Sequence, residues 1–142
     1  MEDSADRSND NNDNRFPRQI RLLTSRDFQR VFQKAEYKSS DRYLTLLACR
    51  NQYDYPRLGL ALTKKKIKTA VARHHLKRLI RESFRRHKQQ LGGLDIIVMG
   101  TKQAQDTPNR TLSKQLQYHW RTLLQLHVQQ QAQQLIRECK DS

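Results

Sequence analysis

The chain has 142 residues, a length that fits a single domain. It carries 28 lysines and arginines against 14 aspartates and glutamates, which gives a formal net charge of +14 at pH 7. No stretch approaches the roughly 20 consecutive apolar residues of a transmembrane helix, so such a helix is excluded. Such an excess of positive charge favours a polyanionic partner, most often a nucleic acid.

The charge is distributed unevenly along the chain. Residues 64–88 hold eleven bases and a single acid, Glu82, which gives this segment a net charge of +10. Residues 1–14 have a net charge of −4 and are rich in Asn, Asp and Ser, which predicts a disordered acidic tail. The N-terminus lacks the apolar segment of a signal peptide, and Cys49 and Cys139 are far apart in the sequence. We therefore expect a cytoplasmic protein with reduced thiols.

The first predicted elements are a helix and two strands. Thr24 or Ser25 caps a helix that ends near Ala35. Three apolar residues recur at helical spacing in it: Phe28, Val31 and Phe32. Residues 42–50 and 57–63 are rich in β-forming and apolar residues, and we expect these two strands to pair with each other.

A second helix, a buried strand and a long final helix follow. The helical period runs through 69–89 and stops at the glycine pair 92–93. Residues 94–99 form a short apolar run that predicts a buried strand. The final helix begins at Thr111, and its Gln-rich distal part is expected to fray or project. This order of elements predicts an α+β fold of two layers, an α/β sandwich.

The helix at 69–89 combines an apolar arc with a basic one. The apolar arc is expected to face the sheet and contains Leu76, Leu79, Ile80, Ser83 and Phe84. Four bases follow one another at i, i+4 spacing, which is about 6 Å along the axis and comparable to the spacing of backbone phosphates: Arg73, Lys77, Arg81 and Arg85. Like charges at this spacing destabilise a helix by a few tenths of a kcal/mol each. Binding to a polyanion would offset that cost.

Several motifs resemble those of one known family. Residues 65–85 (KKIKTAVARHHLKRLIRESFR) resemble the signature of the bacterial ribonuclease P protein subunit, K-K-x-x-x-A-V-x-R-N-R-x-K-R-x-x-R-E. Residues 16–18, 21–22 and 24–32 resemble its N-terminal block, and 95–98 its last strand. One departure is clear, because Arg73-His74-His75 stands where the family has Arg-Asn-Arg. Neutral imidazole binds phosphate less well than guanidinium does.

The resemblance implies a domain organisation and a fold. It spans about residues 15–125, the expected ribonuclease P protein domain, between the tail 1–14 and a Gln-rich C-terminal helix extension, 126–142. The implied fold is α-β-β-β-α-β-α, similar to domain 2 of ribosomal protein S5, with a left-handed βαβ crossover. The third central strand is not distinct in the sequence. It would come from residues near 37–39 or from a division of 42–50.

The resemblance also implies a function. In this family the RNA subunit is the catalyst, requires Mg²⁺, and removes the 5′ leader of precursor tRNA. The protein binds the catalytic RNA and the leader, and supplies neither a catalytic residue nor a metal ligand. DNA and membranes are not expected partners. The residues implied to bind the catalytic RNA are Lys64, Lys65, Lys66, Lys68, Arg73, His74, His75, Lys77, Arg78, Arg81 and Arg85. Those implied to line the leader cleft are Phe28, Phe32 and Tyr43.

Other interpretations remain open at the level of the sequence. For Phe32 a core position and a cleft position are equally supported, whereas for Phe28 the cleft is favoured. Charge and fold class alone also fit a stand-alone RNA-binding or ribosome-associated protein. A helix-turn-helix DNA regulator needs two adjacent helices around a turn, but the basic helix is flanked by strands. A protein-only nuclease is disfavoured because no pair of carboxylates forms a recognisable motif.

Overall fold

The computed structural model describes residues 24–141. The acidic tail 1–14 and the motif residues 16–22 therefore lie outside the described part. The elements, in chain order, are α2 (Ser25–Lys34), β1 (Tyr37–Ser40), β2 (Leu44–Arg50), β3 (Arg57–Ala61), α3 (Ala70–His87), β4 (Leu94–Gly100), the short 3₁₀ helix η2 (Lys102–Asp106) and α4 (Asn109–Asp141). This order confirms the expected α-β-β-β-α-β-α succession.

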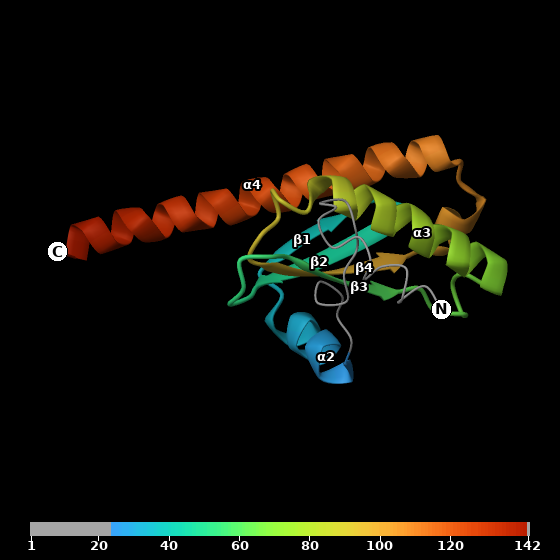
Figure 1. Cartoon of the computed structure of the whole chain (residues 1–142), viewed down its shortest axis with the longest axis horizontal. Helices are drawn as coiled ribbons and strands as arrows, with labels where there is room; N and C mark the ends of the chain where they lie inside the picture. Colours follow the sequence, from blue (N-terminus) through green and yellow to red (C-terminus); the bar gives the residue numbers. More distant parts are fainter. Residues whose placement is uncertain (1–23, 142) are drawn as a thin grey trace, which may run out of the picture.

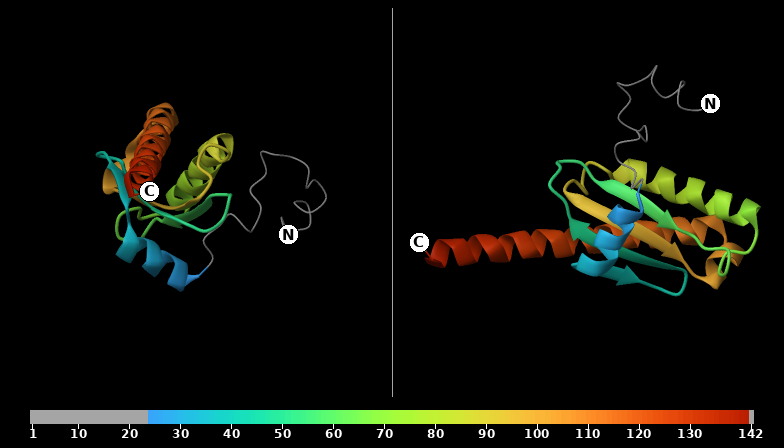
Figure 2. Two further views of the ribbon diagram at one scale, coloured as in Figure 1. Left: turned by 90° about the vertical axis from the view of Figure 1, so that its left-hand side faces the viewer. Right: turned by 90° about the horizontal axis from the view of Figure 1, so that it is seen from below.

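Helices cover both faces of a four-stranded sheet (Figures 1 and 2). On one face, α3 and α4 lie side by side over the main core, which includes Leu46, Ile80, Phe84, Ile96 and Trp120. On the other face, α2 buries Val31 against Cys49 and Ile97 in a smaller cluster. The expected two-layer sandwich is therefore present, and α2 adds a partial layer behind it.

The order of strands in the sheet is β1-β2-β4-β3. The prediction that residues 42–50 and 57–63 pair with each other was wrong, because β4 lies between β2 and β3. It pairs antiparallel with β2, with Leu46 opposite Val98, and parallel with β3, with Leu58 opposite Ile96. The central position suits β4, since the side chains from 94 to 98 are all buried and only an inner strand is covered on both faces.

Tyr37–Ser40, at one edge of the sheet, supplies the strand that the sequence left indistinct. It pairs antiparallel with β2 and alternates between buried and exposed residues. The buried pair, Tyr37 and Ser39, faces α4, where each bonds to a histidine. The contacts are Ser39 Oγ to His119 Nδ1 at 2.5 Å and Tyr37 Oη to His127 Nδ1 at 3.2 Å.

Helices α2 and α3 each begin with a threonine N-cap, and Thr24 is one of the two caps predicted for α2. Thr24 Oγ1 accepts the backbone N–H of Asp27 at 3.1 Å, and Thr69 Oγ1 accepts that of Ala72 at the same distance. Toward its other end, α3 packs on α4 through Phe84, whose ring meets that of Trp120 edge to face at 5.7 Å. This contact places the apolar arc of α3 inward and leaves its basic arc partly buried beside it.

Helix α4 is much longer than the sheet that it covers (Figure 1). Its first half buries a stripe against the core, made of Leu112, Leu116, Trp120 and Leu123. Beyond His127 the side chains are exposed or only partly covered, and the helix continues away from the body of the protein. The Gln-rich part thus projects as a continuous helix. Within residues 24–141, no helix is long and apolar enough to cross a membrane.

Candidate nucleic-acid interface

The loop between β3 and α3 presents three consecutive lysines to solvent. Lys64, Lys65 and Lys66 are exposed, whereas Ile67 is fully buried and anchors the loop in the core. The N–H groups of Lys66 and Ile67 donate to the carbonyl of Thr63 at 3.2 and 2.8 Å, which closes a turn. Because the turn and its apolar anchor fix the backbone, the ammonium groups are held on the outer side of the loop.

Arg73 joins helix α3 to this loop. Its Nη1 donates to the carbonyl oxygens of Ile67 at 2.9 Å and Lys68 at 3.3 Å. The side chain is partly buried, and one edge of its guanidinium is used for contacts within the protein. Arg73 therefore shapes the loop in addition to carrying a positive charge beside it.

The remaining predicted cations follow two rows along α3. His74, His75 and Arg78 are exposed on the outer row, and the partly buried row holds Lys77, Arg81 and Arg85. Glu82 lies 3.5 Å from Arg85, and it is the single acidic residue of α3. We call these six residues, together with Lys64, Lys65, Lys66, Lys68 and Arg73, the basic surface. The structure brings all eleven residues predicted from the signature onto one loop and the helix that follows it.

The two histidines of the basic surface differ in their surroundings. His75 Nε2 lies 2.7 Å from Asn109 Oδ1, a contact that ties α3 to the first residue of α4. His74 forms no hydrogen bond or ion pair with another residue of the described range 24–141. Of the two, His74 is thus the imidazole that is free to meet a phosphate.

The three residues expected to line the leader cleft do not gather in one place. Phe28 is partly buried and packs against the Val31–Cys49–Ile97 cluster, beside Leu47 and Met99. Phe32, one turn further along α2, is 46% exposed, which identifies it as a surface residue. Tyr43 precedes β2 and packs against the main core, on the α3 and α4 side. The α2 face thus offers one exposed phenylalanine, one partly covered phenylalanine and no contribution from Tyr43.

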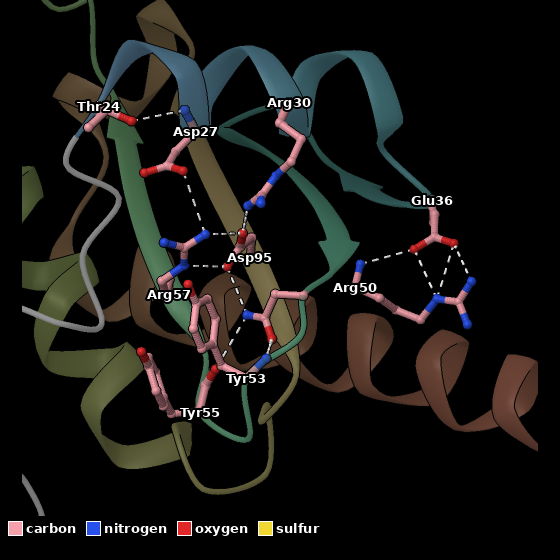
Figure 3. A network of polar contacts seen from close by, with 10 residues as sticks. Thr24, Asp27, Arg30, Glu36, Arg50, Tyr53, Tyr55, Arg57 and Asp95 are labelled. Atoms are coloured by element: carbon pink, nitrogen blue, oxygen red, sulfur yellow. Dashed lines mark hydrogen bonds and ion pairs between the residues drawn. The ribbon is translucent and has the colours of Figure 1, made fainter.

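A buried aspartate organises the polar side of α2, a feature that sequence analysis missed (Figure 3). The Asp95 carboxylate is fully buried and accepts hydrogen bonds from Arg30, from Arg57 at 2.7 and 2.9 Å, and from Asn51 at 2.8 Å. Arg57 also lies 3.7 Å from Asp27 of α2. A carboxylate inside the apolar run LDIIVM was the available signal, because a buried charge requires partners.

A second ion pair, between Glu36 and Arg50, lies at the C-terminal end of β2. Glu36 accepts hydrogen bonds from the Arg50 side chain at 2.9 and 3.2 Å and from its backbone N–H at 2.9 Å. Burial on its own raises the pKa of Glu36, but the hydrogen bonds and charge of Arg50 outweigh that effect and hold the pKa below its ordinary value. Glu36 is therefore a carboxylate at neutral pH, and it neutralises Arg50.

Fold and surface together define a small α+β protein with a basic loop and helix on one side, an arrangement typical of nucleic-acid-binding proteins. The family model for ribonuclease P matches residues 16–124. The ribonuclease P protein component of Vibrio cholerae is 46% identical over 108 residues, which cover 76% of this chain and 91% of that protein. The protein component of Chromohalobacter salexigens is 44% identical over 111 residues, 78% of this chain and 87% of that protein.

Solved structures agree with the sequence matches. The ribonuclease P protein of Staphylococcus aureus superposes with a TM-score of 0.65 at 33% identity, over 70% of this chain and 90% of that one. That of Thermotoga maritima gives a TM-score of 0.63 at 31% identity, over 70% of this chain and 94% of that one. The chain belongs to the ribonuclease P protein family. The family match ends at residue 124, so the projecting part of α4 lies beyond it.

Proposed function

We propose that the chain is the protein subunit of ribonuclease P and assists the catalytic RNA in removing the 5′ leader from precursor tRNA. The observation that carries this proposal is the basic surface, which concentrates the eleven predicted RNA-binding residues on one loop and helix. Its exposed cations are spaced to meet successive phosphates of a structured RNA. In the proposal, this surface docks on the catalytic RNA.

The leader is assigned to the other face of the sheet, beside α2. Phe32 offers an exposed ring on which a base of any sequence can stack, a contact worth about 1–3 kcal/mol. Phe28, one turn earlier, supplies apolar contact and supports the helix. Because α2 and α3 lie on opposite faces of the sheet (Figure 2), one protein can hold the catalytic RNA and the leader at the same time.

The chemistry is assigned to the RNA and its magnesium ions. Several carboxylates in the described part are already engaged by cations of the protein: Asp95 by Arg30 and Arg57, Glu36 by Arg50, and Glu82 by Arg85. Within residues 24–141, no three His, Cys, Asp or Glu side chains are grouped to hold a metal ion. These pairings support a subunit that binds and orients RNA.

Reconstitution tests the proposal. The full chain is mixed with a bacterial ribonuclease P RNA and precursor tRNA at low magnesium, and cleavage of the 5′ leader is compared with that by the RNA alone. We expect faster cleavage with the chain present, and none by the chain without the RNA. No gain over the RNA alone would contradict the proposal and favour a stand-alone RNA-binding protein. Cleavage by the chain alone would instead assign the reaction to the protein.

A further inference from the structure

A pocket of about 740 Å³ opens where the C-terminal half of α2 meets the end of β2 and the following loop. Three cationic side chains and one acidic side chain are part of its lining: Arg30, Lys34, Arg50 and Glu36. At 3.6 residues per turn, Arg30 and Lys34 project roughly 120–200° around the axis of α2 from Phe28 and Phe32. The pocket therefore lies on the flank of α2 opposite the proposed stacking position.

Two of the three cations in the pocket lining, Arg30 and Lys34, can donate further hydrogen bonds. Arg50 is taken up by Glu36. The Lys34 side chain forms no hydrogen bond or ion pair with another residue between 24 and 141. Arg30 reaches Asp95 through Nη2, and its Nε is buried without a partner in that same part of the chain, but the side chain as a whole is 37% exposed and presents the rest of its guanidinium to the pocket. Arg30 and Lys34 are thus the groups that can bind an incoming anion.

Asp95 fixes the position of Arg30 (Figure 3). Its buried carboxylate is shared by Arg30 and Arg57, and Asp27 stands close to Arg57. Two acids therefore balance these two arginines, and Lys34 is left as the cation without a counter-charge. A guanidinium that is already held in place loses little conformational freedom when it binds a ligand. Arg30 thus supplies fixed donors, and Lys34 supplies the net charge.

We infer that this pocket is a second contact for the precursor leader, in which Arg30 and Lys34 hold one backbone phosphate and Asp95 positions Arg30. Phosphate oxygens accept hydrogen bonds from both a guanidinium and an ammonium group. The inference rests on the proposed function, because the leader is the RNA assigned to the α2 side of the sheet. Phe32 and Lys34 share the last turn of α2. Because the pocket lies on the flank of α2 opposite Phe32, a strand stacked on Phe32 needs further nucleotides to reach it, so the contact requires a leader long enough for both.

Leader length provides the test. Holoenzyme reconstituted from the full chain and a ribonuclease P RNA is titrated with precursor tRNAs whose leaders have about 3 or about 12 nucleotides. The double variant Arg30→Gln, Lys34→Gln is expected to bind the long-leader precursor about three- to tenfold more weakly and the short-leader precursor unchanged. Its salt dependence for the long leader should flatten by about 0.7 log units of affinity per log unit of salt, the value for one phosphate contact of a single strand.

Matched variants isolate the contact. Arg42→Gln removes an exposed cation at the opposite end of β2 and should leave both precursors unaffected. Asp95→Asn keeps the size of the side chain but releases Arg30, so it should weaken the long-leader complex alone. Arg30→Lys, which keeps the charge without the guanidinium fork, should lose part of the long-leader affinity and tests the positioning even where Asp95→Asn unfolds the protein. Thermal unfolding of each free variant establishes that it is folded.

Two results would overturn the pocket contact. In one, a folded double variant binds the long-leader precursor as tightly as the wild type does. In the other, it loses the same amount of affinity for the long-leader and the short-leader precursor. A failure of the proposed function itself has a different signature. In that case the wild-type holoenzyme would bind precursor and mature tRNA equally, and Phe32→Ala would leave both affinities unchanged.

Discussion

Arg73 Nη1 lies 2.9 Å from the carbonyl oxygen of Ile67, and this hydrogen bond ties the first turn of α3 to the lysine-bearing loop. The signature arginine thus has a structural task inside the protein. The same guanidinium also bonds to the carbonyl of Lys68 at 3.3 Å. Two side chains therefore stabilise the loop: Ile67, which is buried in the core, and Arg73, which donates hydrogen bonds to the loop carbonyls.

Salt dependence distinguishes this structural task from direct phosphate binding. Arg73→Gln is expected to weaken binding to the catalytic RNA while leaving the slope of log K against log salt nearly unchanged, because the loop loses its anchor and no phosphate contact is removed. Arg78→Gln, at an exposed position of the outer row, should lower the slope by about 0.7–0.9. Equal changes of slope in the two variants would show that Arg73 contacts phosphate directly.

The two phenylalanines of α2 should separate stability from leader binding. Phe32→Ala is expected to cost little stability, since the ring is 46% exposed, but to weaken precursor binding by about 1 kcal/mol, the lower end of base stacking. Phe28→Ala should destabilise the free protein by about 2 kcal/mol, roughly half the cost for a fully buried ring. Urea unfolding of the free protein and titration with precursor and mature tRNA measure both effects. An equal loss for the two tRNAs in Phe32→Ala would argue against stacking by Phe32.

Two buried histidines, His119 and His127, make the stability of the fold depend on pH. Burial lowers the pKa of His119, and Asp41, 2.9 Å from Nε2, offsets that effect only in part. Burial and the charge of Arg50 lower the pKa of His127, against a smaller opposing effect of Glu36. Both groups bind protons more readily in the unfolded chain. Their contribution to stability is therefore complete above the unfolded pKa of about 6.5 and is lost as the pH falls through the lowered values.

Unfolding experiments at several pH values measure this contribution. Each histidine adds at most about 1.4 kcal/mol per pH unit to the slope of the unfolding free energy. His127→Gln, which keeps a hydrogen-bonding group for Tyr37, should reduce the slope between about pH 7 and pH 5. Val128→Ala, at an exposed position of the same helix and without a titratable group, serves as the control and should retain the wild-type slope. A slope in His127→Gln that equals the wild type would show that His127 does not titrate differently on folding.

Sequence patterns predicted the helices and the cap of α2 because these depend on neighbours a few residues away. The i, i+3, i+4 stripe of α2, the hydroxyl of Thr69 before α3 and the apolar arc through Phe84 are all local features. The concentration of positive charge in 64–88 is local as well. At 100° per residue, however, Arg73, Lys77 and Arg81 lie within about 60° of Phe84 on the helix, so they are partly buried while Arg78 is exposed. The sequence therefore predicted where the positive charge is concentrated, but not how far each base is exposed.

The order of strands and the partners of buried polar groups were decided only by the tertiary structure. Asp95 joins Arg30, Asn51 and Arg57, which are 38 to 65 residues away, and His119 meets Ser39 across 80 residues. Such contacts form because burying a charge or a ring nitrogen requires a partner, wherever in the chain that partner lies. The same long-range packing inserted β4 between β2 and β3 and sent Tyr43 to the main core. Local periodicity determined which residues face the core. Their contacts there were determined by two long-range requirements: buried polar groups need hydrogen-bond partners, and a strand buried on both faces must lie inside the sheet.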